Sequence, residues 1–319
     1  MSEFDLIRTY FADIGPRRAD TLLAVGDDCA LLEVPAGHTL AVSIDTLTAG
    51  THFFADCDPE TLGHKSLAVG LSDLAAMGAE PAWSTLALTL PTADRDWIAA
   101  FSRGFATLSR DHGIQLVGGD TTCGHLSVTV QVHGFVPHGQ AIRRDGARPG
   151  DLVFVSGTLG DAGLALRALK SGETVTDLLR RRLECPIPRV ELGMGLRGLA
   201  TAMIDLSDGL AADLGHILRA SGVGAELELA RLPLSPPVAE RVSRHFDWGL
   251  PLASGDDYEL CFCAPPEAAD AVLELGARLA CPVRAVGRIR EGSGLVGQLP
   301  EGGEMPLDGA GYDHFPGPD

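Results

Sequence analysis

The stretch Ser66-Leu67-Ala68-Val69-Gly70-Leu71-Ser72-Asp73-Leu74-Ala75-Ala76-Met77 predicts an apolar helix of small residues with one carboxylate near its end. The helix is expected over 59–77, with Pro59 in its first turn and Gly78 as its stop. Ser66, Gly70 and Asp73 share one face at i, i+4 and i+7. Small residues let another segment pack closely, and a carboxylate there is costly without a partner. The alternative is a solvated face of an amphipathic helix.

Strands and helices alternate on both sides of this stretch. The strands expected in the first half are 22–25, 39–44, 83–90, 114–117 and 126–136, with a helix at 94–112. Those expected in the second half are strands 152–156, 202–205, 258–263 and 283–289, and helices 161–170, 177–183, 189–199, 208–220 and 266–279. The tail after Glu291 is expected to be rich in loops. A turn-rich segment over 137–150 separates the halves, so we predict an α/β or α+β chain of two domains, 1–140 and 141–319.

Composition narrows the function classes. The 319 residues carry a formal net charge of −18, which argues against nucleic acid or an anionic membrane as a partner. We expect a cytoplasmic chain, because no leader and no apolar run long enough to span a bilayer is present. The seven cysteines include no CxxC pair, so neither a disulfide framework nor a zinc site is expected.

Aspartates recur beside Gly, Ser or Thr at the ends of apolar runs. Gly26-Asp27-Asp28 follows a predicted strand, and Ser43-Ile44-Asp45 ends another with a hydroxyl and a carboxylate on one face. Oxygen ligands of this kind suit hard cations such as Mg²⁺. An ordinary turn and a polar strand end remain the alternatives at these two places.

Two further segments combine carboxylates with donors for phosphate. Gly118-Gly119-Asp120-Thr121-Thr122 follows an apolar strand, where backbone N–H groups could cradle phosphate while Asp120 holds a metal. Asp205-Leu206-Ser207-Asp208-Gly209 joins a strand to a helix, with Ser207 as the expected N-cap. The alternatives are a glycine-rich hairpin in the first case and a helix-dipole partner in the second.

An acidic protein can hold a polyphosphate only if cations bridge the two sets of negative charge. Lys65 and Lys170 are the only lysines, and neither follows a Walker-type GxxxxG loop. Arg143-Arg144 is a candidate for a nucleotide phosphate or a solvated basic turn. The GxGxxG match at 193–198 lies in a helix-like stretch, so a dinucleotide site there is not expected.

Over essentially its whole length the chain resembles the thiamine-monophosphate kinases, in the wider superfamily of aminoimidazole ribonucleotide synthetase. The resemblance rests on an ordered set of motifs. They are Val25-Gly26-Asp27-Asp28-Cys29-Ala30, Ser43-Ile44-Asp45-Thr46-Leu47, Gly50-Thr51-His52-Phe53, Leu71-Ser72-Asp73-Leu74, Gly118-Gly119-Asp120-Thr121-Thr122, Ile204-Asp205-Leu206-Ser207-Asp208-Gly209-Leu210, Ser254-Gly255-Asp256-Asp257-Tyr258-Glu259-Leu260 and Gly311-Tyr312-Asp313-His314-Phe315.

The resemblance implies transfer of the ATP γ-phosphoryl group to thiamine monophosphate, in a homodimer whose N-terminal domains join their sheets. It implies several Mg²⁺ ions on Asp28, Ser43, Ile44 (through its backbone), Asp45, Asp73, Asp120, Asp205 and Asp208. It implies ATP on Gly119, Asp120, Arg144 and Ser207, and thiamine monophosphate on His52, Asp256 and Tyr312. The family commonly has Thr at the place of Ile44 and Glu at the place of Asp256.

The acceptor is a phosphate monoester and already ionised, so no general base is needed and direct in-line transfer is our hypothesis. The nearest rival is another ATP-dependent enzyme of the same superfamily that activates a small molecule with phosphate. A rival from a different class is a non-catalytic divalent-cation binding protein, which would not be expected to bind a nucleotide.

Overall fold

A computed structural model describes residues 3–307 and 311. The chain divides into two compact units. The N-terminal unit comprises Met1–Leu74 and Ala79–Gly139, and the C-terminal unit comprises Ala75–Gly78 and Gln140–Asp319. None of the described helices combines the length and apolar character needed to cross a membrane.

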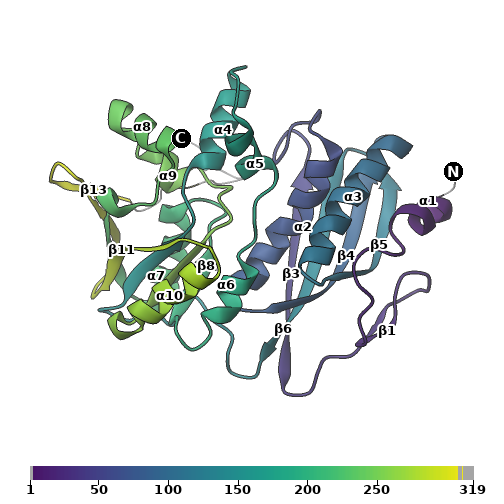
Figure 1. The fold of residues 1–319 in the computed structure, drawn as a ribbon, viewed down its shortest axis with the longest axis horizontal. Coiled ribbons are helices and arrows are strands. Elements are labelled where there is room, and N and C mark those ends of the chain that lie inside the picture. Colours follow the sequence, from purple (N-terminus) through teal and green to yellow (C-terminus); the bar gives the residue numbers. More distant parts are fainter. Residues whose placement is uncertain (1–2, 308–310, 312–319) are drawn as a thin grey trace. The chain divides into compact units, whose positions relative to one another are not determined.

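The N-terminal unit is built on a four-stranded sheet in the order β3 (His38–Thr48), β6 (Ser127–Pro137), β4 (Glu80–Leu90) and β5 (Gln115–Cys123). Only the β4–β5 pair is parallel. Helices α2 (Pro59–Ala76) and α3 (Arg95–Asp111) pack on one face of the sheet (Figure 1). The unit also contains α1 (Glu3–Tyr10) and a small ladder of β1 (Thr21–Leu23) with β2 (Leu31–Leu32).

The small residues of α2 serve close packing, as its sequence predicts. A Cβ added at Gly63 would lie 2.0 Å from the carbonyl oxygen of Phe101, and one at Gly104 would lie 1.8 Å from that of Glu60. The backbones of α2 and α3 therefore touch where these glycines meet them. On the sheet side, a Cβ at Gly70 would lie 3.1 Å from the methyl groups of Val132 in β6.

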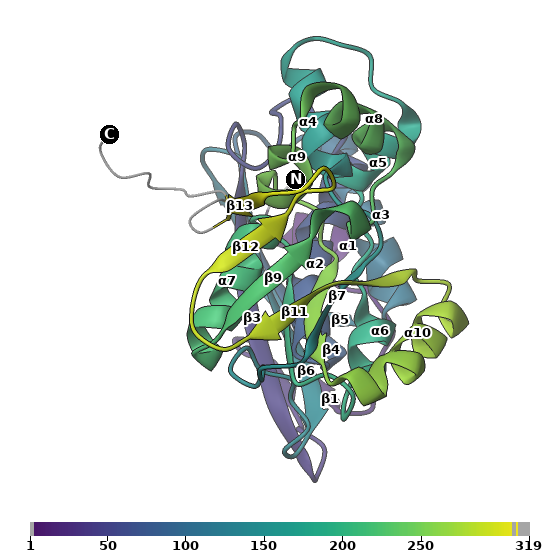
Figure 2. The same ribbon diagram turned by 90° about the vertical axis from the view of Figure 1, so that its left-hand side faces the viewer.

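The C-terminal unit contains a seven-stranded sheet. Its order is β13 (Glu304–Pro306), β12 (Leu295–Gln298), β9 (Gly224–Glu228), β11 (Val283–Arg290), β7 (Leu152–Ser156), β10 (Leu260–Ala264) and β8 (Ala202–Asp205). Figure 2 shows β12, β9 and β11 side by side. The accompanying helices are α4 (Asp161–Lys170), α5 (Asp177–Glu184), α6 (Val190–Gly195), α7 (Leu210–Ser221), α8 (Pro236–His245), α9 (Gly249–Ala253) and α10 (Ala269–Arg278), with single 3₁₀ turns at Leu229–Arg231 and Pro266–Ala268.

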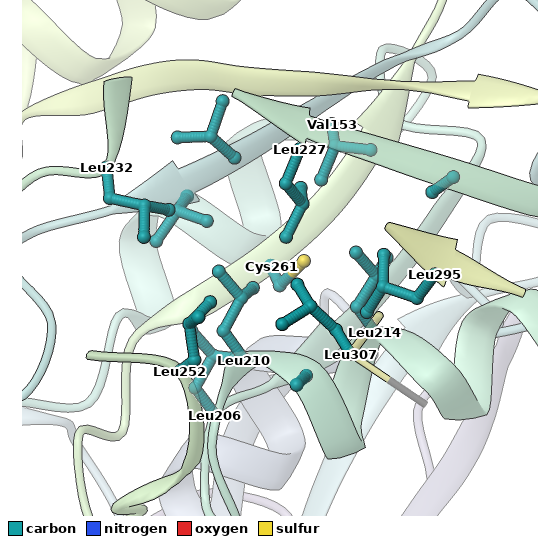
Figure 3. Packing of buried hydrophobic residues seen from close by; sticks show 14 of the residues in the cluster. Val153, Leu206, Leu210, Leu214, Leu227, Leu232, Leu252, Cys261, Leu295 and Leu307 are labelled. Atoms are coloured by element: carbon teal, nitrogen blue, oxygen red, sulfur yellow. The ribbon is translucent and has the colours of Figure 1, made fainter. Parts of the chain in front are cut away.

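Alternation along the central strands gives this sheet two apolar faces. Val153 and Cys261 face the leucines of α7, including Leu210 and Leu214, in one buried cluster (Figure 3). The intervening Phe154 and Phe262 stack on each other with ring centroids 5.3 Å apart. A strand that is buried on both faces appears in sequence as a continuous apolar run, which is why β7 is predicted with its observed bounds.

The tail after Glu291 is rich in loops, as predicted, but also contains the short strands β12 and β13, of which β12 pairs with the distant strand β9. Two sequence predictions are wrong, one in each unit. The helix predicted at 189–199 ends early, at Gly195. The segment 118–122 does not follow a strand but continues β5 along β4, past a register shift next to Gly118. Both the phosphate-loop and the hairpin interpretation of its conformation are therefore replaced by a strand.

Candidate functional site

Ser43 and Asp45 of β3 meet Asp73 of α2. The Ser43 hydroxyl donates a hydrogen bond to Asp73. The Oδ2 atom of Asp45 is buried and has no hydrogen-bond partner among the described residues. It faces Gly70, where an added Cβ would lie 3.6 Å away. Burial and then the negative charge of Asp73 raise the pKa of Asp45 to about 7. A buried oxygen without a partner beside a second carboxylate fits a bound cation.

A second group surrounds a cavity of about 470 Å³ in the N-terminal unit. Asp27, Asp28, Gly119 and Asp120 line it together with apolar side chains that include Phe4 of α1. Gly119 has a φ of +154°, and a Cβ there would lie 1.9 Å from the carbonyl oxygen of Leu86. Only glycine fits this contact between β5 and β4, so the residue brings the backbone and Asp120 to the edge of the cavity.

The order of the strands keeps these two groups apart within one sheet. β3 carries Ser43 and Asp45 at one edge, whereas β5 carries Gly119 and Asp120 at the other, and β6 and β4 lie between them. Across residues 3–307 and 311, no three His, Cys, Asp or Glu side chains are placed to hold one metal ion. Within the N-terminal unit, the predicted ligands therefore lie in two separate groups.

A third group lies in the C-terminal unit, where β8 leads into α7. Asp205 ends β8, and Ser207 and Asp208 form the turn that follows. The prediction that Ser207 caps the helix is wrong, because the N-cap is Gly209 with a φ of 109°. Instead, Oδ2 of Asp213 accepts hydrogen bonds from the backbone N–H groups of Asp208 (3.1 Å) and Gly209 (3.0 Å). Both donors lie before the first residue of α7, so a side chain inside the helix satisfies N–H groups of the turn that precedes it.

Electrostatics connect Arg144 to the same turn. Burial, followed by the charge of Asp208, raises the pKa of Asp213 to about 7, while Arg144 acts in the opposite direction. The backbone carbonyl of Arg144 accepts a 2.9 Å hydrogen bond from the hydroxyl of Ser221 at the end of α7. Arg143 instead pairs with Asp145 at 2.6 Å, so of the two adjacent arginines Arg144 is the one tied electrostatically to the turn.

The segment that carries Asp256 packs directly on this turn. The N–H of Asp256 donates to the carbonyl of Ser207, and the N–H of Tyr258 donates to that of Leu206, both at 2.8 Å. Asp256 and Tyr258 have positive φ values of 60° and 48°. Residues other than glycine rarely adopt positive φ angles. Such angles persist where the surrounding structure holds the backbone in place.

A buried ionic network behind this segment is missed by the sequence prediction. Glu259 has 0% exposure and accepts two hydrogen bonds from Arg189, at 2.7 and 2.6 Å, and one from Arg182 at 2.9 Å. The hydroxyl of Ser156 donates a fourth, at 2.6 Å. The available signal was a glutamate directly before the apolar strand Leu260–Ala264, but its arginine partners lie 70 and 77 positions away in sequence.

The remaining predicted residues take separate places. Nδ1 of His52 accepts a 3.0 Å hydrogen bond from the N–H of Thr48, which leaves the proton of a neutral ring on Nε2. The Ile44 side chain is 62% exposed and faces away from Ser43 and Asp45, so only its backbone carbonyl could serve as a ligand. Tyr312 lies outside the described residues.

The GxGxxG match at 193–198 has a packing role. A Cβ at Gly193 would lie 2.0 Å from the carbonyl oxygen of Ala75, and one at Gly195 would lie 2.7 Å from Leu275. These glycines let α6 lie against neighbouring segments of the C-terminal unit.

Family models match both halves of the chain. The model for the AIR synthase related protein, N-terminal domain, matches residues 26–136, and that for the C-terminal domain matches 148–300. Thiamine-monophosphate kinase of Escherichia coli (strain K12) is 46% identical over 99% of both chains. The enzyme of that name from Haemophilus influenzae is 42% identical, over 99% of this chain and 98% of its own.

Solved structures agree with these matches. Thiamine-monophosphate kinase from Stenotrophomonas maltophilia K279a has a TM-score of 0.83 and 49% identity, and the match covers 87% of this chain and 91% of that one. AaThiL complexed with AMPPCP and TMP has a TM-score of 0.78 and 28% identity, with 98% and 96% covered. The hydrogenase maturation protein HypE, at 22% identity and a TM-score of 0.80, shares the fold.

Proposed function

This chain belongs to the thiamine-monophosphate kinases of the AIR synthase related family, and from that membership we propose which of its residues carry out the reaction. It is an enzyme that uses ATP to phosphorylate thiamine monophosphate. Similarity over 99% of the chain to a kinase of this specificity is the observation that carries the function. The geometry of the described residues supports a division of metal binding and substrate binding among them.

We propose that the carboxylates hold several Mg²⁺ ions, which neutralise phosphate charge when bound. The proposed ligands are Asp28, Ser43, the carbonyl of Ile44, Asp45, Asp73, Asp120, Asp205 and Asp208. Asp45 supports this assignment most directly, because its buried Oδ2 lies beside Asp73 without a hydrogen-bond partner among the described residues. Without a cation, the raised pKa of Asp45, about 7, favours the protonated form of this carboxyl group below neutral pH.

Each of the two substrates is assigned residues from both halves of the chain. Gly119 and Asp120 at the cavity, with Arg144 and Ser207, are proposed to bind ATP. His52, Asp256 and Tyr312 are proposed to bind thiamine monophosphate. In this division, residues 1–140 bind ATP and Mg²⁺ and form the dimer, and residues 141–319 complete the active site.

The proposed chemistry is direct in-line transfer. The acceptor phosphate is already ionised at neutral pH, so the protein has no proton to remove from the attacking oxygen. Its task is to align two anions and to reduce their repulsion, as in other phosphoryl transfers with loose transition states. The proposed carboxylate ligands and Arg144 serve that task, and no side chain needs to accept the phosphoryl group.

A homodimer is proposed from the edge of the N-terminal sheet. β3 pairs only with β6 in the described part of the chain. Leu40, Val42 and Ile44 form an apolar row on one side of this edge strand, with exposed fractions of 39%, 49% and 62%. An exposed apolar edge of this kind invites pairing with another strand, and joining the sheets of two copies would cover it.

The test is incubation of the purified chain with ATP, Mg²⁺ and thiamine monophosphate. We expect thiamine diphosphate and ADP in equal amounts, and no ADP when the acceptor is omitted. ATP made chiral at the γ-phosphorus then separates the mechanisms: inversion supports direct transfer, and retention would rule it out in favour of a phosphoenzyme.

A further inference from the structure

Asp213 is a buried carboxylate that no substrate or metal role accounts for. It lies in the first turn of α7 and is 2% exposed. Its Oδ2 atom accepts hydrogen bonds from two backbone N–H groups, those of Asp208 at 3.1 Å and Gly209 at 3.0 Å. Both donors belong to the turn that carries Ser207 and Asp208.

This arrangement differs from an ordinary helix cap. A cap side chain normally precedes the helix and satisfies N–H groups inside it. Here the N-cap position is Gly209, which has no side chain, and Asp213 reaches backwards from within α7. The bonds therefore fix the turn before the helix as much as the helix itself.

The same turn is held from its other side by the Asp256 segment. The carbonyl groups of Leu206 and Ser207 accept 2.8 Å hydrogen bonds from the N–H groups of Tyr258 and Asp256. Together with Asp213, these contacts fix carbonyl and N–H groups on successive residues from 206 to 209. A backbone held on both sides leaves the Asp208 carboxylate little freedom in its direction.

We propose that Asp213 is a positioning residue that holds the backbone of Asp208, so that the Asp208 carboxylate is presented to Mg²⁺ in the required direction. The inference rests on the proposed function of Asp208 as a metal ligand. Asp213 acts through its hydrogen bonds and touches neither substrate nor metal. Residues that orient metal ligands typically change affinity or activity by about 10–100-fold when they are removed.

Three variants separate geometry from charge. Asp213→Ala removes both hydrogen bonds, and Asp213→Glu keeps the charge but displaces it by one methylene. Asp213→Asn keeps an acceptor oxygen at the same reach without the charge. We expect Asp213→Ala and Asp213→Glu to raise the Mg²⁺ concentration for half-maximal activity by about tenfold. Asp213→Asn should stay within about threefold of the wild type.

Asp151 offers a matched control in the same unit. It is 4% exposed, and its Oδ2 accepts hydrogen bonds from the Arg148 N–H at 3.0 Å and from the Thr201 hydroxyl at 2.6 Å. Thr201 precedes β8, whereas Asp205 lies at the far end of that strand. Asp151→Ala should lower the melting temperature but leave the Mg²⁺ dependence unchanged. An equal Mg²⁺ shift in Asp151→Ala would mean that general loss of stability explains the effect.

Amide hydrogen exchange gives a second measurement, made without Mg²⁺ or substrate. The amides of Asp208 and Gly209 should exchange faster in Asp213→Ala than in the wild type, and Asp213→Asn should protect them. If Asp213→Ala does not fold, Asp213→Glu takes its place in both measurements. A wild-type Mg²⁺ dependence in folded Asp213→Ala, or impairment in Asp213→Asn but not in Asp213→Glu, contradicts the proposal. A wild-type chain without kinase activity would instead contradict the proposed function, and the exchange measurement would still test the positioning.

Discussion

The backbone N–H of Asp256 donates a 2.8 Å hydrogen bond to the carbonyl oxygen of Ser207. The residue proposed to meet thiamine monophosphate is therefore bonded directly to a residue proposed to meet ATP. Asp256 has a φ of 60°, so this hydrogen bond holds its backbone in a conformation that residues other than glycine seldom adopt. A displacement of the Ser207 turn should therefore move the Asp256 segment, and the reverse.

Asp256→Asn should separate the roles of side chain and backbone. Asparagine tolerates positive φ nearly as well as aspartate, so the melting temperature should change little. Loss of the negative charge should raise the KM for thiamine monophosphate several-fold and leave the KM for ATP unchanged. Asp256→Ala should add a stability loss of about 1 kcal/mol, because alanine adopts this φ poorly. A raised KM for ATP alone would remove Asp256 from the acceptor site.

Glu259→Gln should destabilise the chain strongly. Burial alone would raise the pKa of Glu259, but the hydrogen bonds and charges of Arg189 and Arg182 hold it below its ordinary value. Loss of one partner from a buried ionic network costs about 3–5 kcal/mol. Urea unfolding at pH 7 measures this loss, and a change of less than 1 kcal/mol would contradict it.

The same lowered pKa predicts a dependence of stability on pH. A carboxyl group whose pKa is lower in the folded state contributes stability above its unfolded pKa, and this contribution disappears as the pH falls through the folded value. The wild type should therefore lose stability on acidification below about pH 4.5, close to the reference value for Glu. Glu259→Gln should lose less stability than the wild type as the pH falls below about 4.5, because it lacks this titrating group.

Gly119→Ala should damage the edge of the cavity. The added Cβ would lie 1.9 Å from the carbonyl oxygen of Leu86, at a φ of +154°. We expect a stability loss of about 1–3 kcal/mol together with a higher KM for ATP. Gly118→Ala is the neighbouring control, since its Cβ would meet only a methyl group of Thr85 at 4.0 Å. Equal effects of the two substitutions would argue against the contact as the cause.

Asp45→Asn should abolish most of the kinase activity without unfolding the chain. In the absence of Mg²⁺ the variant should melt at the same temperature as the wild type or higher, because it removes the repulsion between Asp45 and Asp73. Mg²⁺ added with an ATP analogue should raise the melting temperature of the wild type only, because a ligand stabilises the state that binds it. Equal stabilisation of both chains would show that Asp45 is not a ligand.

Val42→Glu tests the proposed dimer. Val42 lies in the apolar row of β3, is 49% exposed, and belongs to none of the proposed ligand sets. A buried charge at a joined sheet edge is costly, so light scattering should report a monomer or a weaker dimer. The melting temperature of the monomer should stay close to that of the wild type. An unchanged dimer would place the interface elsewhere.

The sequence by itself determined most of the helices and strands that carry the proposed ligands, but not α8, α9, β12 or β13. Helix α2 and strand β7 are recognisable from local patterns, because small-residue and apolar periodicity reflect contacts that each element makes along its whole length. The sequence also places Ser43 and Asp45 on one side of β3, whereas their meeting with Asp73 depends on how α2 packs on the sheet.

Only the tertiary structure decided where those elements meet. The order of the strands places Asp120 and Asp45 at opposite edges of the N-terminal sheet. The arginines that pair with Glu259 lie 70 and 77 residues away in the sequence. The observed N-cap of α7 is Gly209 and not Ser207, and the side chain of Asp213 accepts the hydrogen bonds of the preceding turn. Such partners are selected by long-range packing and by the cost of leaving a buried polar group unsatisfied, and neither leaves a periodic trace in the chain.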